Sequence, residues 1–504
     1  MSAGDGTPRL GPLGPLSATE PEDPRAAGNG HRLVAARRGA ADPATLARLR
    51  EIEREIFARR PEHSIEPSMD RIAALTTLLG DPQRACPVIH ITGTNGKTTT
   101  ARMIETLLRA RGLRTGLFTS PHLSATSERI RIDGEPLSAE SFVAAYDEIK
   151  PYVELVDQQQ PVRMSFFEML TGMAFAAFAD APVDVAILEV GLGGTWDATN
   201  VADGAVAVVT PVAIDHTVYR GDTVTSIATE KAGIIKPGAT AILARQPQDA
   251  ADVLLARAAE VGATVAREGV DFEVADRELA VGGQVLTLRG LGGEYPEVVL
   301  PLFGAHQAEN AACALAAAEA FAMVPQSEAM LETGQLDEEL VRQAFAAVTA
   351  PGRLEIVRRS PVVIVDSAHN PAGMAVSMDA VTEAFAFDTL VAVFAVSADK
   401  DVPGICDELE PVADHLVVTQ NSSVRSMPAK DLAEIAAEVF GPDRVTAIPR
   451  LDEAIDAAIG LADEAAGDNP GAAGVLITGS VMTAGEARVL LGADAPPGGS
   501  LDDA

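Results

Sequence analysis

An apolar run followed by a glycine-rich turn, PVIHITGTNGKTTT at residues 87–100, sets the first limit on the fold. The run at 87–92 predicts a buried strand, and a helical pattern follows over 97–111. Glycines let backbone N–H groups approach an anion, and the N-terminus of a helix favours negative charge. The general phosphate loop has four residues between its glycines, whereas this loop has two, Thr94 and Asn95. A plain turn before a helix is the alternative, but the strand, the helix and the Gly-Lys-Thr ending favour a phosphate site.

The rest of the chain alternates short apolar runs with helical patterns. The runs at 185–190 and 205–210 predict further buried strands, so we expect a mostly parallel sheet with helices on both faces. Residues 264–300 carry alternating runs and many glycines, which predict a small antiparallel meander. A second α/β pattern begins near residue 350. Its predicted strands are 362–366, 390–394, 415–419, 445–448 and 475–478.

Composition divides the chain into two folded domains between two tails. Residues 1–44 are rich in Gly, Pro, Ala and charge and predict a disordered tail, as do residues 493–504. We expect a nucleotide-binding domain over 45–349 and a second α/β domain over 350–492, joined at Thr-Ala-Pro-Gly, 349–352. Two such domains on a short hinge predict a cleft, where ligands usually bind.

Charge and cysteine usage exclude several classes of protein. The chain has 39 basic and 72 acidic residues, a formal net charge of −33, which argues against non-specific binding to nucleic acid or anionic membranes. Its three cysteines, Cys86, Cys313 and Cys406, lie far apart, so we expect neither a disulfide framework nor a structural zinc site. No run of about 18 apolar residues and no secretory signal is present, so we expect a cytoplasmic protein.

A second motif, LEVGLGGTWDATN, covers residues 188–200. Glu189 ends an apolar strand, at the edge where ligands bind in open α/β sheets, and a carboxylate there is costly unless it meets a cation. A metal ion is one explanation; a cap on a turn or helix is the other. The glycines do not match a dinucleotide fingerprint, because Trp196 occupies the third glycine position.

Other candidate residues allow two interpretations each. His216, after the strand at 205–210, is either a ligand for metal or phosphate or an ordinary loop histidine. Lys231, in EKAGIIK at 230–236, is either functional or a surface lysine with a buried stem. The motif DSAHNP at 366–371 is at least a strand-to-helix turn.

Together these motifs resemble the Mur-ligase superfamily. GTNGKT, TSPHL, LEVGLGGTWDATN, DH…EKAGIIK, GAHQAENAACAL, PGRLE and DSAHNP occur in the order typical of it, over roughly residues 45–492. The TSPHL and LEVGLGG versions are similar to the branch of dihydrofolate synthases and folylpolyglutamate synthases. The resemblance implies an α/β fold with a central phosphate-loop ATPase domain and a C-terminal Rossmann-like domain. It also implies an ATP-dependent ligase that phosphorylates a substrate carboxylate and lets the amine of L-glutamate attack the acyl phosphate.

The resemblance also implies roles for individual residues. The implied catalytic residues are Lys97, His216 and Lys231. The implied ATP contacts are Thr94, Asn95, Gly96, Lys97, Thr98, Asn310, Arg353 and Asp366, with His369 and Asn370 beside them. The implied metal ligands are Thr98, Ser120, Glu189, His216 and Lys231, the lysine as a carbamate.

In bifunctional members of the branch, three segments form the dihydropteroate pocket. They correspond here to Ile65, Glu66 and Pro67; to Ser165, Phe166, Phe167 and Glu168; and to Trp196, Asp197 and Ala198. The two phenylalanines suit stacking on a flat pterin, although helix core explains them equally well without the resemblance. Trp196 replaces a small or aliphatic residue of the family, which bears on substrate preference.

The implied activity is bifunctional: dihydropteroate and reduced folates both accept L-glutamate. The implied cofactors are two Mg²⁺ ions, K⁺ and ATP as substrate, and we expect a monomer with small-molecule partners, no nucleic acid and no membrane. Alternatives are a monofunctional folylpolyglutamate synthase and another Mur-type ligase acting on a UDP-muramyl precursor, although the latter usually has an extra N-terminal domain. A phosphate-loop switch or motor leaves TSPHL and DSAHNP unexplained. A non-enzymatic relative would be expected to lose Lys97, Glu189 or Lys231, and all three are present.

Overall fold

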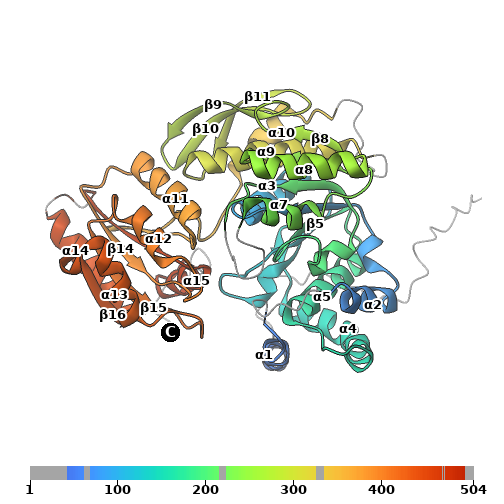
Figure 1. The fold of residues 1–504 in the computed structure, drawn as a ribbon, viewed down its shortest axis with the longest axis horizontal. Coiled ribbons are helices and arrows are strands. Elements are labelled where there is room, and N and C mark those ends of the chain that lie inside the picture. The colour runs from blue at the N-terminus through green and yellow to red at the C-terminus, as the bar shows by residue number, and fades with distance from the viewer. Residues whose placement is uncertain are drawn as a thin grey trace, which may run out of the picture.

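The structure is a computed structural model that describes residues 42–61, 68–214, 223–324, 334–467, 469 and 471–493. This part of the chain forms two lobes (Figure 1), with the C-terminal α/β unit on the left and everything before it on the right. Most of the two predicted tails lies outside the described residues. Helix α1 (Pro43–Phe57) begins inside the predicted N-terminal tail, because the Asp42 carboxylate accepts hydrogen bonds from the N–H groups of Ala44 and Thr45.

The larger lobe is built on an eight-stranded sheet with the order β4-β3-β2-β5-β1-β6-β7-β8. From β2 to β8 all neighbouring strands run parallel, as predicted for this α/β class. The strands are β1 (Val88–Thr92), β2 (Thr115–Phe118), β3 (Ile130–Ile132), β4 (Glu135–Pro136), β5 (Val185–Glu189), β6 (Gly204–Val209), β7 (Thr240–Leu243) and β8 (Thr264–Arg267). The α-helices after α1 are α2 (Asp70–Leu78), α3 (Lys97–Ala110), α4 (Ala139–Gln159), α5 (Phe166–Asp180), α7 (Val224–Ala232), α8 (Gln248–Val261), α9 (Ala305–Ala322) and α10 (Glu338–Ala346).

Both faces of this sheet are covered by helices, which explains its continuous apolar strands. Val185 and Ile187 of β5 belong to the core that contains α3 and α9, whereas Ala186 and Leu188 belong to the core that contains α4 and α5. Successive side chains of a strand point to opposite faces, so an unbroken apolar run fills both cores. The strand end carrying Glu189 is thereby fixed between two packed layers.

The predicted meander over 264–300 is partly wrong. Residues 264–267 form β8, which pairs in parallel with β7 in the large sheet. The antiparallel meander comprises only β9 (Glu273–Ala280), β10 (Gly283–Arg289) and β11 (Glu294–Leu300). The reason is that α8 ends at Gly262, whose left-handed φ of 67° turns the chain back to complete a parallel crossover.

The second lobe holds a six-stranded sheet with the order β12-β13-β17-β14-β15-β16, in which only β12 is antiparallel to its neighbour. All five strands predicted here are present. The strands are β12 (Glu355–Arg359), β13 (Val362–Val365), β14 (Thr389–Phe394), β15 (His415–Gln420), β16 (Val445–Arg450) and β17 (Ala473–Thr478). The helices are α11 (Pro371–Ala384), α12 (Val402–Leu409), α13 (Ala429–Phe440), α14 (Leu451–Ala466) and α15 (Val481–Leu490). Short 3-10 helices complete the chain: η2 (Pro82–Arg84), η3 (Thr126–Arg129), η4 (Ala198–Val201) and η5 (Pro442–Arg444).

The meander joins the two lobes beside α11 (Figure 1). The Arg277 guanidinium on β9 makes a bidentate ion pair with Glu383 near the end of α11. Next to this pair, the rings of Phe303 and Phe385 lie 5.1 Å apart between centroids. These contacts fix one side of the cleft between the lobes.

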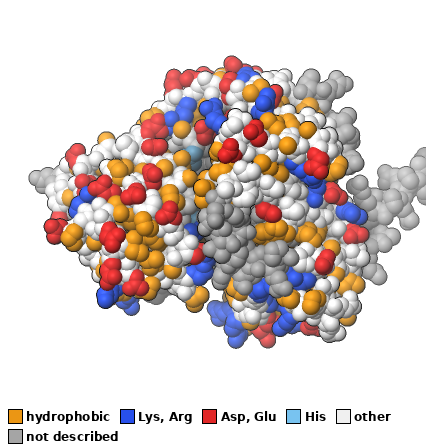
Figure 2. Space-filling view, viewed as in Figure 1, with side chains coloured by type: hydrophobic (Ala, Val, Ile, Leu, Met, Phe, Trp, Pro, Cys, Tyr) orange, Lys and Arg blue, Asp and Glu red, His pale blue; other side chains and the backbone are white. Residues whose placement is uncertain are grey.

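Charged side chains of both signs are scattered over the face drawn in Figure 2, and the basic ones form no single patch there. Among the described helices, none is long and apolar enough to cross a membrane. The three cysteines are unbridged.

Candidate active site

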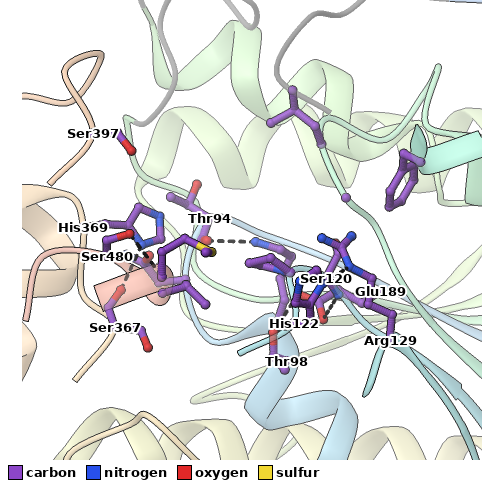
Figure 3. Close-up of a pocket in the computed structure, with 18 of the residues that line it drawn as sticks. Thr94, Thr98, Ser120, His122, Arg129, Glu189, Ser367, His369, Ser397 and Ser480 are labelled. Carbon is purple, nitrogen blue, oxygen red and sulfur yellow. Dashed lines mark hydrogen bonds between the residues drawn. The ribbon is translucent and has the colours of Figure 1, made fainter. Parts of the chain in front are cut away.

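A cavity of about 610 Å³ lies between the two lobes and is lined by residues of both. Figure 3 shows Thr94, Thr98, Ser120 and Glu189 on the side of the large lobe, facing Ser367, His369, Ser397 and Ser480 of the C-terminal lobe. The cavity contains most of the residues that the sequence singles out, although they come from segments up to several hundred residues apart.

The loop between β1 and α3 has the backbone shape expected of a phosphate site. Gly93 and Gly96 have φ of 148° and 85°, and a Cβ on either would collide with a neighbour: 1.8 Å from Thr210 Oγ1 for Gly93 and 2.5 Å from Asn310 Oδ1 for Gly96. The Thr210 hydroxyl also donates to Asn95 O at 2.7 Å. Glycine is therefore required twice, and the loop leads directly into the N-terminus of α3, a position that favours an anion.

Lys97 folds back over this loop. Its Nζ donates to Gly93 O at 3.2 Å and to Thr94 O at 3.0 Å. These hydrogen bonds hold the ammonium group next to the phosphate loop. Asn310 of α9 is buried beside Gly96, and Arg353 and Asp366 line the same cavity from the C-terminal side. The eight residues implied as ATP contacts thus meet around one cavity.

Glu189 lies at the end of β5 with 1% of its surface exposed. Its two carboxylate oxygens accept the Thr98 hydroxyl at 2.8 and 3.0 Å, and one accepts Ser120 N–H at 3.2 Å. Burial raises the pKa of the Glu189 carboxyl, and the nearby Lys97 ammonium and these donors act against that rise. Two of the implied metal ligands, Thr98 and Ser120, therefore contact a third, Glu189, and all three carry side-chain oxygen atoms, the donors that Mg²⁺ prefers.

Lys231 is buried, so the interpretation as a surface lysine is wrong. It is 1% exposed on α7, and its Nζ donates to Gly93 O at 2.5 Å. The neighbouring loop explains this position, because a Cβ on Gly194 would lie 2.4 Å from Glu230 O and Thr195 N–H donates to that same oxygen at 2.9 Å. Gly194 thus lets the loop pack closely on α7, with Lys231 against the phosphate loop.

Two parts of the predicted site cannot be placed. His216, an implied metal ligand, and the implied acceptor contacts Ile65, Glu66 and Pro67 all lie outside the described residues. Within the described ranges there is no group of three or more His, Cys, Asp or Glu side chains that could hold a metal ion.

The remaining implied acceptor contacts form one wall of the cavity. Phe167 packs against Gly191, where a Cβ would lie 2.6 Å from the ring, and Trp196 packs in the same way against Gly193. Asp197 is 3% exposed, and its neighbour Ala198 is also buried. Phe167, Trp196 and Asp197 all line the cavity, which gives it a flat apolar wall with one carboxylate.

Arg71 of α2, which the sequence analysis missed, lies beside the N-terminus of α5. Ser165 caps α5, and both oxygens of Glu168 bind the Arg71 guanidinium, at 2.9 and 3.1 Å. Glu168 also accepts Ser165 N–H at 2.7 Å, and Arg71 lines the cavity. Glu168 thus holds Arg71 in place, and nothing in the sequence around Arg71 indicates this.

On the same side, Arg129 donates from Nε to His122 Nδ1 at 2.9 Å, and its guanidinium lies 5.0 Å from the Phe166 ring centre. The Phe166 ring stacks on Phe57 at 5.2 Å between centroids. Phe166 therefore belongs to the core and also lines the cavity. The two interpretations, helix core and contact with a pterin, do not exclude each other.

On the C-terminal side, Asp366 organises the start of the second lobe. Its carboxylate accepts Leu354 N–H at 3.1 Å, Ala368 N–H at 2.9 Å and the Ser377 hydroxyl at 3.0 Å. His369 donates from Nδ1 to Ser367 O at 3.0 Å. Further cavity-lining residues that the sequence analysis did not name are Ser397, Lys400, Arg425 and Ser480.

Comparison with known proteins identifies the family. Residues 91–318 match the Mur ligase middle domain, and residues 352–481 match the Mur ligase glutamate ligase domain. The chain is 50% identical over 471 residues to the dihydrofolate synthase/folylpolyglutamate synthase of Mycobacterium tuberculosis, covering 90% of this chain and 96% of that protein. The chain belongs to the dihydrofolate synthase/folylpolyglutamate synthase family. The resemblance drawn from the motifs is thereby confirmed.

Solved structures of this family agree with the fold. The M. tuberculosis folylpolyglutamate synthase complexed with ADP and AMPPCP is similar with a TM-score of 0.84 and 51% identity, over 89% of this chain and 99% of that one. Escherichia coli FolC in complex with DHPP and ADP is similar with a TM-score of 0.75 and 30% identity, over 88% of this chain and 98% of that one. As a member of the dihydrofolate synthase/folylpolyglutamate synthase family, the chain is an ATP-dependent Mur-type ligase.

Proposed function

We propose that the chain joins L-glutamate to dihydropteroate and to the glutamyl tail of reduced folates, at the expense of ATP. One observation carries the proposal: a single cavity holds the phosphate loop with Lys97, the buried carboxylate of Glu189, and an aromatic wall with Asp197. A ligase of this type needs these three elements together, because it must bring a nucleotide phosphate to the carboxylate of a flat aromatic acceptor.

The proposed reaction has two steps. A carboxylate oxygen of the acceptor attacks the γ-phosphorus of ATP, and the bond to ADP breaks, which leaves an acyl phosphate. The amine of L-glutamate then attacks the acyl carbon, the amide bond forms, and phosphate leaves as the amine loses its proton. Lys97 and the N–H groups of the phosphate loop would hold the transferred phosphoryl group, and Arg353 would offset negative charge from the opposite lobe. Closure between the lobes would keep water from the acyl phosphate.

The Mg²⁺ site fits the residues present. The hydroxyls of Thr98 and Ser120 and the Glu189 carboxylate offer hard oxygen donors, and a carboxylate buried to this degree needs a cation. Bound Mg²⁺ would offset the repulsion between the acceptor carboxylate and the ATP phosphates. His216 and a carbamylated Lys231 are the further ligands that we propose for a second ion, and a requirement for K⁺ remains a prediction.

The aromatic wall would bind the pterin. Phe167 and Trp196 offer flat surfaces, and the Asp197 carboxylate can accept hydrogen bonds from ring N–H groups. Ser165, Phe166, Glu168 and Ala198 would shape the pocket around these contacts. The monofunctional alternative, a folylpolyglutamate synthase, rests on Trp196. Its large ring would reduce the space in the cavity where dihydropteroate would bind.

The C-terminal lobe would hold L-glutamate. Lys400 and Arg425 line the cavity there, Arg425 in an ion pair of 2.6 Å with Asp399, and His369 and Ser480 lie with them. Such groups suit the two carboxylates of the amino acid. We further propose a cytoplasmic monomer, which light scattering in solution tests for the oligomeric state.

Phosphate release from ATP by the purified protein tests the proposal, with L-glutamate and Mg²⁺ present and with 7,8-dihydropteroate or tetrahydrofolate as acceptor. Release with both acceptors, dependent on L-glutamate, is the expected result. Release with tetrahydrofolate alone favours the monofunctional alternative and directs attention to Trp196. Release with neither acceptor contradicts the folate assignment.

A further inference from the structure

A chain of three buried side chains runs from the central strand of the large sheet to the acceptor wall. His90 of β1 contacts Thr199 of η4, with 2.8 Å between Nε2 and Oγ1. The Thr199 hydroxyl in turn donates to Asp197 Oδ1 at 2.5 Å. His90 and Thr199 have no exposed surface, whereas Asp197 lines the cavity. The first two residues therefore lie behind the wall, and only the third can touch a ligand.

Which group donates in each of these hydrogen bonds follows from the protons that the three side chains carry. Asp197 also accepts Thr199 N–H at 2.9 Å and Leu192 N–H at 3.0 Å, so all three of these groups around its carboxylate are donors. A hydroxyl has one proton. Since Thr199 gives that proton to Asp197, its oxygen must accept from the imidazole, which places the His90 proton on Nε2.

The charge state of His90 agrees with this assignment. Burial, together with the Lys236 ammonium, lowers the pKa of His90 to about 3, so the ring is neutral at physiological pH. Its other nitrogen, Nδ1, is buried without a hydrogen-bond partner among the described residues. Burial raises the pKa of Asp197, and the backbone and hydroxyl donors oppose that rise; no charged side chain is among the causes.

We propose that Thr199 and His90 are positioning residues that fix the Asp197 carboxylate for the pterin of the acceptor. The inference rests on the proposed function, in which Asp197 contacts the pterin. The carboxylate group of an aspartate on a turn can rotate about its side-chain bonds. Each hydrogen bond donated from the side away from the cavity restricts this rotation. Thr199 holds one oxygen of the carboxylate, the Leu192 N–H group holds the other, and His90 orients the Thr199 hydroxyl.

The space for this chain is built into the sheet. Gly204 begins β6 beside β1, and a Cβ there would lie 3.1 Å from the Cβ of His90. The turn that carries Thr199 is fixed separately, since Asn200 Nδ2 donates to Thr195 O at 3.0 Å. The backbone of the turn therefore has its own support, and the hydroxyl of Thr199 can be removed without removing that support.

The test compares steady-state constants for dihydropteroate and ATP in Thr199→Val, which keeps shape and loses the hydroxyl, and Thr199→Ser, which keeps the hydroxyl. We expect KM for dihydropteroate to rise about tenfold in Thr199→Val, while KM for ATP stays within about twofold and Thr199→Ser behaves like the parent. A second pair tests the imidazole independently: His90→Gln retains an N–H near the position of Nε2, and His90→Met does not. Only His90→Met should raise KM for dihydropteroate.

Asp197→Asn separates this inference from the proposed function. If Asp197→Asn leaves KM for dihydropteroate unchanged, the acceptor pocket itself is misassigned. If Asp197→Asn raises KM but Thr199→Val and His90→Met do not, the positioning role is wrong. A loss of thermal stability in Thr199→Val with unchanged KM values likewise contradicts it, because that result assigns the hydroxyl to structure alone.

Discussion

Asn95 of the phosphate loop and Asn370 at the start of α11 exchange hydrogen bonds across the cleft. Asn370 Nδ2 donates to Asn95 Oδ1 at 3.2 Å, and Asn95 Nδ2 donates to Asn370 Oδ1 at 3.4 Å. The same Asn370 oxygen caps α11 by accepting Gly373 N–H at 2.7 Å. The loop that would hold ATP is thus tied directly to a helix terminus of the other lobe, 275 residues further along the chain.

Breaking this contact should weaken ATP binding. Asn370→Ser keeps a capping oxygen but is too short to reach Asn95, so we expect KM for ATP to rise about three- to tenfold at nearly unchanged stability. Asn370→Ala also loses the cap and should lower the free energy of unfolding by about 1 kcal/mol. Steady-state kinetics and urea unfolding measure the two effects. Equal KM values for ATP in the parent and both variants would refute the coupling.

Lys231 should matter for turnover more than for nucleotide binding. In Lys231→Ala we expect kcat to fall about 100-fold or more, because the residue lies at the phosphate loop beside the proposed metal site. The Kd for ATP should change less than about threefold. Lys430→Ala, which removes a lysine of α13 with 86% of its side chain exposed, serves as the control and should keep full activity. Unchanged turnover in Lys231→Ala would exclude both catalysis and carbamylation at this residue.

Glu189→Gln should shift the dependence on Mg²⁺. The amide keeps the size of the side chain but removes its charge, so the Mg²⁺ concentration for half-maximal activity should rise at least about tenfold. Thr98→Ser retains the hydroxyl that contacts Glu189 and should respond to Mg²⁺ like the parent. A titration of activity against Mg²⁺ decides the matter, and coincident curves for parent and Glu189→Gln would mean that Glu189 holds no metal.

Acid should destabilise the protein through His90. Its pKa is about 3 in the folded state, below the ordinary value of 6.5. Below pH 6.5 the unfolded chain binds a proton that the folded state does not, so stability falls as the pH falls toward 3. At pH 5 this amounts to ~2 kcal/mol.

Denaturant unfolding of the parent and His90→Gln at pH 7 and pH 5 isolates this contribution from the other titrating groups. The parent should lose ~2 kcal/mol more than His90→Gln between the two pH values. An identical loss in both proteins would show that His90 does not titrate in this way.

The phosphate loop and several of the strands around the site could be predicted from the sequence. The glycines at 93 and 96 and the strand before them indicated a phosphate loop, and the structure gives both glycines left-handed or crowded positions that a side chain could not occupy. Strands β1, β5 and β6 of the large sheet and strands β13 to β17 of the second sheet followed from continuous apolar runs, whereas β7 was not predicted and β8 was assigned to the meander. The hairpin of β3 and β4 was not predicted, although its turn, Asp133-Gly134, has φ of 52° and 81° and is a recognised hairpin signal.

Other features depend on the tertiary structure and have no local signal. Arg71 comes from an ordinary helix and enters the cavity only because Glu168 binds it from α5. His90 reads as an isolated polar residue in a strand, and its partner Thr199 is 109 residues away. The sequence left Lys231 open between a functional and a surface lysine, and its burial follows from the close approach of the loop at Gly194. These contacts join residues far apart in the sequence and arise from tertiary packing, which the pattern of a single sequence does not predict.

In the proposed mechanism ATP phosphorylates the acceptor carboxylate. Dihydropteroate labelled with ¹⁸O in its carboxylate tests this directly, when it is turned over with ATP and L-glutamate and the released phosphate is analysed by mass spectrometry. We expect one ¹⁸O atom in each molecule of phosphate formed in the coupled reaction, because the C–O bond of the acyl phosphate breaks when the amine attacks. Phosphate free of the label would contradict an acyl-phosphate intermediate, since its oxygen would then have come from water.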